Sequence, residues 1–206
     1  MTDHYKLFEP AIECLEGFIQ RYKTLKNCEI EIKIGRIEED VFEPGLNSDA
    51  FYNKIKDILD SSNVWNKVNM VDTKEYIGKD IKRVGDKYIH KKRLETAIFK
   101  FNGTPYDFKI TVSQELKHDG KNFKSELIRN KKRISYTYKE CLFDLTKVET
   151  ETDDEIIENE EFEIELVNLN STTSDKYRAH SALLKIYDII NMCEEISGNA
   201  TIVKIN

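Results

Sequence analysis

Two segments of this sequence alternate strictly between charged and aliphatic side chains, and this alternation constrains the fold more than any other feature. Residues 29–35 read Glu-Ile-Glu-Ile-Lys-Ile-Gly, and residues 161–166 read Glu-Phe-Glu-Ile-Glu-Leu. Side chains two apart share one face of a β-strand and lie about 6–7 Å from each other. Both segments are therefore predicted to be strands with one charged face and one apolar face.

Two further segments repeat this arrangement. Residues 129–133 place Arg129, Lys131 and Arg133 on one face over about 13 Å, close to the reach of a short polyphosphate. Residues 107–115 place Asp, Lys, Thr, Ser and Glu on one face and Phe, Ile and Val on the other. A single strand of this kind ordinarily has its polar face in water. Several strands that segregate acids from bases are unusual, because like charges on one face repel unless something compensates them.

A closed barrel with the polar faces turned inward would explain the pattern. The isoleucine faces would then be covered by helices, and the interior would be a charged tunnel. Carboxylates would hold a hard divalent cation through oxygen, while Arg and Lys would bind phosphate oxygens. An ordinary solvated surface crossed by salt bridges remains the alternative on charge counts alone.

The rest of the chain predicts a β-rich α+β domain. Apolar residues at three- and four-residue steps predict a helix over 9–26, with Pro10 in its first turn. Ser48 can cap a second helix that buries Phe51, Ile55, Ile58 and Leu59, and Ser174 can cap a third that buries Tyr177, Leu184, Ile186, Ile190 and Cys193 before Gly198. Period-two alternation predicts strands at Glu29–Arg36, Tyr106–Leu116, Glu126–Tyr138, Glu140–Val148 and Glu161–Asn168, with weaker candidates at Val64–Ile77, Asp80–Val84, Lys87–Leu94, Ala97–Phe101 and Thr201–Ile205. Tight hairpin turns are expected at Gly85-Asp86 and Asn102-Gly103, and a longer polar loop at Glu151–Asn159.

Composition is consistent with one domain over residues 1–206. With 39% hydrophobic residues, 34% charged residues, eight glycines and three prolines, the chain can bury one core, and it has too few glycines and prolines for a linker-rich protein. No segment resembles a signal peptide or a membrane span, so neither export nor membrane association is expected. The four cysteines are scattered without a Cys-x-x-Cys pair, which favours a reducing intracellular compartment.

The net charge of −6 hides two opposite segments. Residues 149–165 contain ten acids and no Lys or Arg, and the other 189 residues hold 28 acids and 32 bases, a net charge of +4. Basic residues concentrate at 79–93 and 121–133. Separate acidic and basic segments are what a site for both a metal cation and a polyanion would need.

Four motifs in order resemble those of the metal-dependent RNA 5′-triphosphatases of mRNA capping, the fungal, protozoan and viral type within the triphosphate tunnel metalloenzymes. They are Glu-Ile-Glu-Ile-Lys at 29–33, Arg-x-Lys-x-Arg-Ile-Ser-Tyr at 129–136, Asp-Leu-Thr-Lys-Val at 144–148 and Glu-Phe-Glu-Ile-Glu at 161–165. The segment from Tyr106 to Glu115 resembles the strand that carries a required glutamate in that family. The resemblance implies a closed eight-stranded antiparallel barrel, the triphosphate tunnel, with flanking helices and Mg²⁺ or Mn²⁺ inside.

The resemblance also implies roles for particular residues. Metal ligation would fall to Glu29, Glu31 and Glu165, with Glu163 acting through metal-bound water. Phosphate binding would fall to Lys131, Arg133, Arg83, Lys91, Lys109 and Arg129. Lys131 and Arg133 would also be catalytic residues, together with Glu163 and Glu115. Glu115 would orient the attacking water, while Asp144, Thr146 and Lys33 would position other side chains. The sequence departs from the family at Leu142, where a basic residue is usual, and the register of residues 79–93 is open between close neighbours.

The function implied is hydrolysis of the γ-phosphate of 5′-triphosphate RNA by in-line attack of water, a reaction that asks mainly for positioning and charge neutralisation. A tunnel hydrolase of inorganic tripolyphosphate or of a small organic triphosphate remains the alternative, and a non-catalytic phosphate-binding module is a third. The partners implied are the 5′ end of nascent RNA, possible side substrates among nucleoside triphosphates, and an mRNA guanylyltransferase acting in trans. The compartment would be the nucleus in a eukaryote or a cytoplasmic replication site for a virus.

Overall fold

The computed structural model describes residues 4–46, 48–101, 104–193 and 200–205. Within these residues, three helices and ten strands follow one another. Their order is α1 (His4–Tyr22), β1 (Cys28–Glu38), β2 (Val41–Pro44), α2 (Asp49–Ser61), β3 (Lys67–Ile77), β4 (Ile81–Val84), β5 (Lys87–Phe101), β6 (Asp107–His118), β7 (Leu127–Tyr138), β8 (Cys141–Glu151), β9 (Ile156–Leu166), α3 (Asp175–Cys193) and β10 (Ala200–Ile205).

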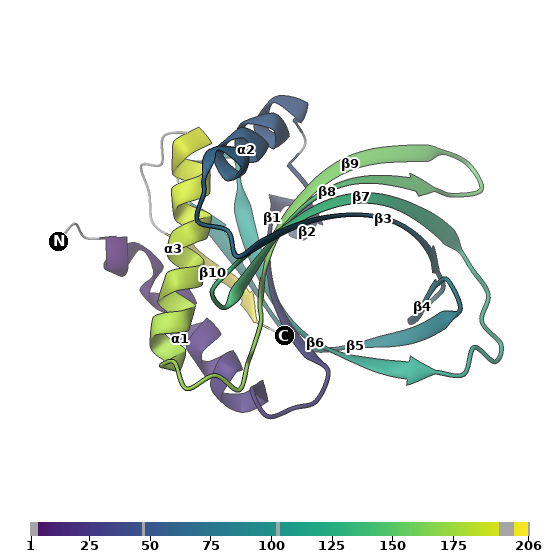
Figure 1. The fold of residues 1–206 in the computed structure, drawn as a ribbon, viewed down its shortest axis with the longest axis horizontal. Coiled ribbons are helices and arrows are strands. Elements are labelled where there is room, and N and C mark those ends of the chain that lie inside the picture. The colour runs from purple at the N-terminus through teal and green to yellow at the C-terminus, as the bar shows by residue number, and fades with distance from the viewer. Residues whose placement is uncertain (1–3, 47, 102–103, 194–199, 206) are drawn as a thin grey trace.

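Eight of the strands close into an antiparallel barrel. The neighbours run β5-β4-β3-β7-β8-β9-β1, and β6 pairs with both β1 and β5, which completes the circle. Figure 1 looks into this barrel, with β7, β8 and β9 arching over one side and β5 and β6 forming the other. Strands β2 and β10 pair with the outside edges of β1 and β5. The expected barrel is therefore confirmed.

The alternating segments have the orientation that the sequence predicted. Ile30, Ile32 and Ile34 of β1 are fully buried under the helices, while Glu29, Glu31 and Lys33 line the interior cavity. In the neighbouring strands, the residues paired with Glu29, Glu31 and Lys33 also face the interior, because side chains directly opposite each other in a ladder share a face. Gly35 is required where β1 meets β2, since a Cβ there would lie 2.2 Å from the carbonyl oxygen of Glu43.

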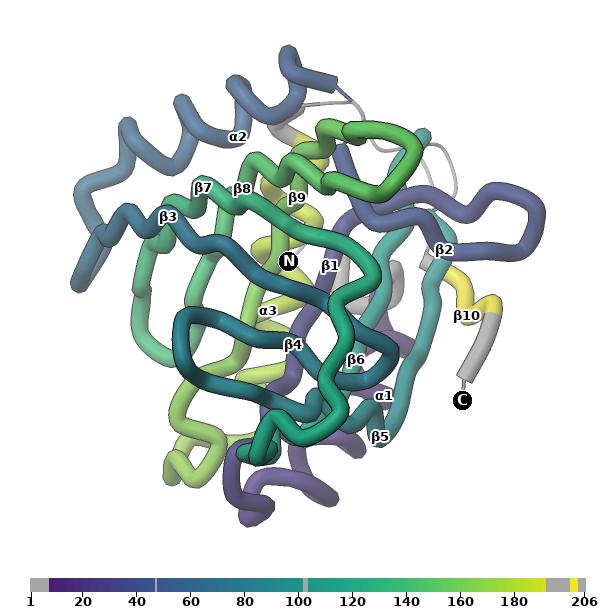
Figure 2. Tube along the Cα trace, turned by 90° about the vertical axis from the view of Figure 1, so that its right-hand side faces the viewer, coloured from purple at the N-terminus to yellow at the C-terminus, as the bar shows by residue number. Residues whose placement is uncertain are grey.

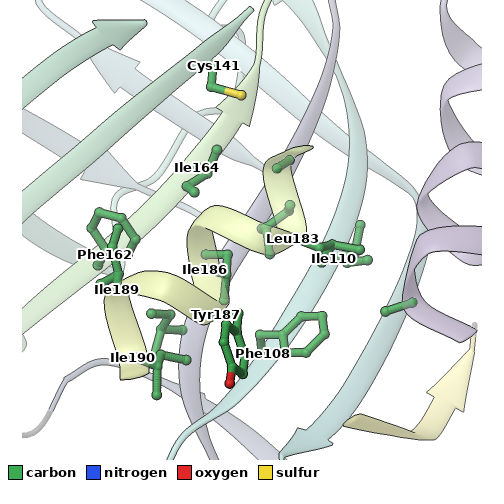
Figure 3. Packing of buried hydrophobic residues seen from close by; sticks show 14 of the residues in the cluster. Phe108, Ile110, Cys141, Phe162, Ile164, Leu183, Ile186, Tyr187, Ile189 and Ile190 are labelled. Carbon is green, nitrogen blue, oxygen red and sulfur yellow. The ribbon is translucent and has the colours of Figure 1, made fainter. Parts of the chain in front are cut away.

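The hydrophobic core lies outside the barrel, between its wall and the helices. Leu183, Ile186 and Ile190 of α3 pack toward Phe108 and Ile110 of β6 and toward β9 (Figure 3). On α1, the buried face is Phe8, Ala11, Ile12, Leu15, Phe18 and Ile19. Burying this much apolar surface outside the wall leaves the barrel interior free for charged groups.

Helix α2 is held by specific polar contacts as well as by its apolar face. Ser48 caps it as predicted, and its hydroxyl oxygen accepts a hydrogen bond from the Phe51 amide at 3.3 Å. Phe51, Ile55 and Leu59 are buried and Ile58 is partly buried, as expected. The Tyr136 hydroxyl of β7 donates to Asp60 at 2.6 Å, which ties this helix to the barrel.

Two of the helix predictions need correction. Helix α1 begins at His4 and ends at Tyr22, earlier than the expected 9–26, so Pro10 lies within the helix instead of in its first turn and Leu25 is exposed beyond its end. In α3, Ile186 and Ile190 are buried as expected, but Leu184 is only partly buried beside the fully buried Leu183, and Tyr177 is 56% exposed. The expected burial of Cys193 and the end of this helix before Gly198 lie outside the described side chains and residues.

The strand predictions fail where the alternation changes phase. Lys87–Leu94 and Ala97–Phe101 are one strand, β5, with a bulge between Arg93 and Glu95 that inserts one residue and shifts the face of everything after it. The polar loop expected at Glu151–Asn159 is limited to residues 152–155, because β8 and β9 pair from Glu151 and Ile156 onward. The predicted turn at Gly85-Asp86 is confirmed, with Gly85 at φ +56°, whereas Asn102-Gly103 lies outside the described residues.

A connection of residues 119–126 joins β6 to β7 and runs past the short strand β4, as Figure 2 shows. The Glu126 amide donates to the Ile77 carbonyl at 2.7 Å, and Phe123 packs edge-on against Tyr88. The connection therefore packs beside the part of the barrel with short strand pairing, where β4 pairs with only three residues of β3.

Within the described part of the chain, no helix is both long enough and apolar enough to cross a bilayer. Cys14, Cys28 and Cys141 are free thiols. Burial raises the pKa of Cys14 and of Cys28 to about 11, so neither is poised as a thiolate nucleophile at neutral pH.

Candidate active site

The barrel encloses a cavity of about 1120 Å³ whose lining is dominated by charged side chains. Acids and bases come from different strands and meet inside. The charged residues that line it include Glu29, Glu31, Lys33, Glu75, Lys82, Lys91, Arg93, Lys109, Glu115, Arg129, Lys131, Arg133, Glu161, Glu163 and Glu165. All the expected site residues lie on this lining except Arg83, Asp144 and Thr146, which are described below.

Adjacent strands β1 and β9 supply most of the carboxylates. Their register pairs Glu31 with Glu165 and Lys33 with Glu163, so the expected metal ligands lie on neighbouring positions of one surface. Lys33 Nζ lies 2.6 Å from a carboxylate oxygen of Glu163. Burial opposes ionisation of Glu163, but Lys33 and Arg133 outweigh it and lower its pKa to about 2. Glu163 is therefore an anion throughout the neutral range.

Glu165 is in the opposite situation. Burial and the neighbouring acids Glu29, Glu31, Asp144 and Glu163 together raise its pKa to about 8. Leu142 is its direct cross-strand neighbour, at the position where a basic residue was expected. Among the described residues, no Lys or Arg forms an ion pair with Glu165, so this carboxylate lacks a compensating cation.

Lys91 connects the two carboxylates of β1. Its ammonium lies 2.8 Å from Glu29 and 2.8 Å from Glu31, and these contacts outweigh burial and raise the pKa of Lys91. Over the described residues, no three carboxylate, imidazole or thiol groups converge into a ready-made metal site. The donor chemistry nevertheless fits a hard divalent cation, because glutamate oxygens from β1 and β9 face one another and Glu165 has excess negative charge around it.

The basic row of β7 lies across the cavity from β5 and β6. Arg129 lies 2.6 Å from Glu161, and Lys131 lies 2.8 Å from Glu75. Arg133 reaches Asp144 at 2.8 Å and Glu163 at 3.2 Å. An acid from another strand therefore orients each base: β9 for Arg129, β3 for Lys131 and β8 for Arg133.

Asp144 and Thr146 of β8 both contact the guanidinium group of Arg133. Asp144 is 1% exposed and accepts a hydrogen bond from the Ser135 hydroxyl at 2.5 Å, and its other oxygen pairs with the guanidinium. The Thr146 hydroxyl oxygen accepts from Arg133 Nε at 3.3 Å. Burial raises the pKa of Asp144 despite the nearby guanidinium. Both residues therefore contact Arg133, and their positioning role stays a prediction.

The structure corrects one expected phosphate ligand. Arg83 lies over the ring of Tyr76, 4.0 Å from its centroid, and is not part of the tunnel lining. Its neighbour Lys82 enters the cavity and lies 2.7 Å from Glu115, the residue expected to orient water. The reason is the two-residue turn at Gly85-Asp86, which sets Lys82 opposite Ile89 and fixes which side chain faces inward.

Lys109 lines the cavity as expected, but its surroundings differ from those of the β7 row. Its ammonium lies 4.5 Å from the centroid of the Phe42 ring, and it forms no ion pair with any described carboxylate. Burial, together with the nearby Lys33 and Arg93, lowers the pKa of Lys109 to about 8.

Three residues of the tunnel lining were given no role by the sequence reasoning. Glu161 shares its face with Glu163 and Glu165, so the predicted strand already placed it in the tunnel. Lys82 and Glu75 had no such signal, because β4 is four residues long and β3 mixes polar residues on both faces. Their place follows only from the register with β5 and β7.

Comparisons with known proteins agree with this geometry. The sequence profile described as "mRNA capping enzyme, beta chain" matches residues 46–203. The chain resembles the solved structure of the Schizosaccharomyces (S. pombe) Pct1 RNA triphosphatase, with a TM-score of 0.67 and 18% identity over 86% of this chain and 91% of that one. It resembles Pct1 in complex with the Spt5 CTD similarly, with a TM-score of 0.69 and 16% identity over 86% and 92% of the two chains.

Among curated proteins, no sequence matches this chain. The likeness to Pct1 shows a common fold, the triphosphate tunnel. The family match covers most of the chain and includes the basic row of β7, the Asp-Leu-Thr segment of β8 and the glutamates of β9. This chain belongs to the mRNA triphosphatase family, the beta chains of mRNA capping enzymes.

Proposed function

We propose that the tunnel hydrolyses the γ-phosphate of 5′-triphosphate RNA to give diphosphate-ended RNA and phosphate, with a divalent cation bound by the carboxylates of β1 and β9. Family membership supports RNA 5′-triphosphatase activity. The observation that carries the proposal is the placement of glutamates from β1 and β9 and the Arg-x-Lys-x-Arg row of β7 in one enclosed cavity.

Phosphoryl transfer needs little covalent help from the protein, so this arrangement is sufficient for it. Arg133 and Lys131 would hold the oxygens of the β- and γ-phosphates, since Asp144, Thr146 and Glu75 already orient them. Neutralising the charge on the phosphate oxygens favours the transition state over the ground state. The same row would align the chain for in-line attack.

Glu115 is the proposed group that accepts a hydrogen bond from the attacking water. It lines the cavity and lies 2.7 Å from Lys82, which orients it. The three described cysteines have no place in the lining of this cavity, so water is the nucleophile that the site supports.

The metal would be held by Glu29, Glu31 and Glu165, with Glu163 nearby, and Mg²⁺ or Mn²⁺ suits such oxygen ligands. A bound divalent cation would supply charge neutralisation to the phosphate oxygens. It would also compensate Glu165, whose pKa is raised by burial and by its acidic neighbours. Among the other carboxylates, Glu29 and Glu31 contact Lys91, and Glu163 contacts Lys33.

We also infer that residues 1–206 act as one catalytic domain and that the product RNA passes in trans to a guanylyltransferase. The compartment would then be the one in which nascent RNA is capped, the nucleus in a eukaryote or a cytoplasmic replication site for a virus. Nucleoside triphosphates are expected as side substrates, since the tunnel lining recognises phosphate oxygens.

The test is release of labelled γ-phosphate from triphosphate RNA, ATP and tripolyphosphate in parallel, with EDTA, Mg²⁺ or Mn²⁺. Metal-dependent release from RNA is the expected result. Glu31→Ala should abolish it, while Glu158→Ala, an exposed acid on β9, should not. Release from tripolyphosphate with RNA untouched would instead identify a tunnel polyphosphatase, and no release from any substrate would leave a phosphate-binding module.

A further inference from the structure

A second cavity lies on the outer face of the barrel wall, between the β7–β8 turn and the first half of α3. Its volume is about 250 Å³. Cys141 of β8 and Leu166 of β9, which are paired directly across the ladder, are buried in its lining. The pocket shares no lining residue with the tunnel, so the proposed hydrolysis leaves it without a role.

One base and one acid of the pocket are committed to the framework. Arg178 of α3, whose side chain is only 1% exposed, donates hydrogen bonds to the carbonyl oxygens of Val167 and Leu169 at 3.0 Å each. Its Nε lies 3.0 Å from the carboxylate of Glu140, which also accepts from the Thr173 hydroxyl at 3.1 Å. These two charges therefore compensate each other and hold the connection between β9 and α3 against the β7–β8 turn.

Two lysines of the pocket have no such partner. Lys139 and Lys185 line it, and among the described residues neither forms an ion pair with a carboxylate. The Lys185 ammonium donates to the hydroxyl of Ser181 at 2.6 Å, which is a neutral acceptor. The ammonium groups lie 5.1 Å (Lys139) and 6.0 Å (Lys185) from the ring centroid of Tyr138. With three cations and one carboxylate, the lining has a net charge of +2.

The backbone holds Lys139 at the rim of the pocket. Tyr138 and Cys141 are cross-strand neighbours, so Lys139 and Glu140 form a two-residue turn. Lys139 has φ +51°, in the left-handed region, where Gly, Asn and Asp are the usual residues of such a turn. A lysine is less favourable than these residues here, and side chains held in such conformations concentrate at binding and active sites.

Aromatic side chains stand beside these cations. Tyr138 is half-buried, and Tyr177 is 56% exposed although its helical periodicity predicted burial. A cavity of about 150 Å³ holds one benzene ring. A volume of about 250 Å³ therefore has room for one ring and an anionic group attached to it.

We propose that this pocket binds a phosphorylated tyrosine side chain of a partner protein. Its ring would pack against Tyr138 and Tyr177, and its phosphate would be bound by Lys139 and Lys185. A phosphate monoester carries a charge of about −1.5 to −2 at pH 7, which matches the net charge of the lining. Because the volume admits only one side chain, the rest of the ligand would lie outside, as it does for one residue of a polypeptide. The proposal does not depend on the reaction in the tunnel.

The test is titration calorimetry in EDTA with a glycine pentapeptide whose central residue is phosphotyrosine, phosphoserine or tyrosine, and with inorganic phosphate. The pocket variants are Lys139→Met, Lys185→Met and Tyr177→Ala. The matched control is Lys100→Met, which removes an equal charge from an exposed position of β5 outside both cavities. Arg93→Met removes a cation from the tunnel lining and reports any binding there.

The phosphotyrosine peptide should bind the wild type, and the tyrosine peptide should not. Each lysine variant should weaken binding about tenfold, the effect of losing one charge-assisted contact at a partly exposed site, while Lys100→Met and Arg93→Met should match the wild type. Tyr177→Ala should weaken binding of the phosphotyrosine peptide more than binding of the phosphoserine peptide. The melting temperatures of the lysine variants should not fall, because these lysines have no ion pair to lose among the described residues.

No binding of the phosphotyrosine peptide would overturn the proposal, and so would wild-type affinity in both lysine variants. Loss of affinity in Arg93→Met alone would place the peptide in the tunnel and refute the pocket as its site. Equal affinity for the phosphoserine peptide or for inorganic phosphate would refute the aromatic part of the ligand. None of these results bears on hydrolysis of triphosphate RNA, which the release of labelled phosphate tests separately.

Discussion

Glu75 is the residue whose removal best tests the electrostatic design of the tunnel. Its carboxylate lies 2.8 Å from Lys131 Nζ, and the two side chains are only 11% and 10% exposed. Burial favours the neutral form of Glu75, but Lys131 outweighs this and lowers the pKa of Glu75. In contrast, burial and Arg129 lower the pKa of Lys131 even with Glu75 present.

Glu75→Gln should therefore be strongly destabilising. Removing one partner leaves the other as a buried charge without compensation, which typically costs about 3–5 kcal/mol. Water in the tunnel moderates this cost, so we expect a loss of about 3 kcal/mol in the free energy of unfolding. The double variant Glu75→Gln/Lys131→Met should recover most of the loss, because both charges are then gone.

The measurement is urea denaturation of the two single variants and the double variant at pH 7 in EDTA. The matched control is Lys147→Met, which breaks an exposed pair with Asp49, with side chains 47% and 72% exposed, and should cost less than about 1 kcal/mol. A loss below 1 kcal/mol for Glu75→Gln would refute the argument. A double variant as unstable as the sum of the singles would refute it as well, since the pair would then have no coupling energy.

Three further outcomes are expected. Glu165→Gln should stabilise the metal-free protein at pH 8.5 but hardly at pH 5. The folded-state pKa of about 8 lies above the unfolded value of 4.5, so the stability of the wild type falls as pH rises between these values, and the glutamine variant avoids the fall. Denaturation in EDTA at both pH values checks this, and an equal gain at both would contradict it. Arg133→Ala should reduce kcat for triphosphate RNA by about 10³-fold, in the range seen when a group stabilising the transition state is lost, whereas a tenfold effect or less would exclude Arg133 from that role. Tyr136→Phe should lower the free energy of unfolding by about 1.5–3 kcal/mol through loss of its hydrogen bond to Asp60, with wild-type KM, and unchanged stability would show that α2 is held by packing alone.

The fold was predictable because alternation is a local property. The isoleucines at 30, 32 and 34 and the glutamates between them decide which face of β1 meets the helices, whatever strand lies next to it. The same reasoning located the acids of β9 and the bases of β7. The order of the motifs, through their resemblance to a known family, then predicted the closed barrel, which no single strand implies.

The missed residues depend on pairing between strands. Lys82 and Arg83 are equally polar neighbours, and only the turn at Gly85-Asp86 decides which one reaches Glu115. Glu75 lies on a strand without a consistent apolar face, so its inward orientation follows from its pairing with Arg129 on β7. A shift of one residue in either ladder would exchange the inner and outer side chains.

The β5 bulge shows why a break in periodicity should be treated as information. Lys91 and Arg93 follow one phase and Ala97 and Phe99 follow the other, and reading the change as the end of a strand loses the connection between them. The pairing with β6 continues through the break, so the change of phase is a single inserted residue, Leu94. Because the core needs the aromatic side chains outside and the substrate needs cations inside, a strand that serves both must change phase somewhere along its length. The position of that change determines how far the cationic face extends, and here it ends at Arg93, level with Glu29 of the proposed metal site.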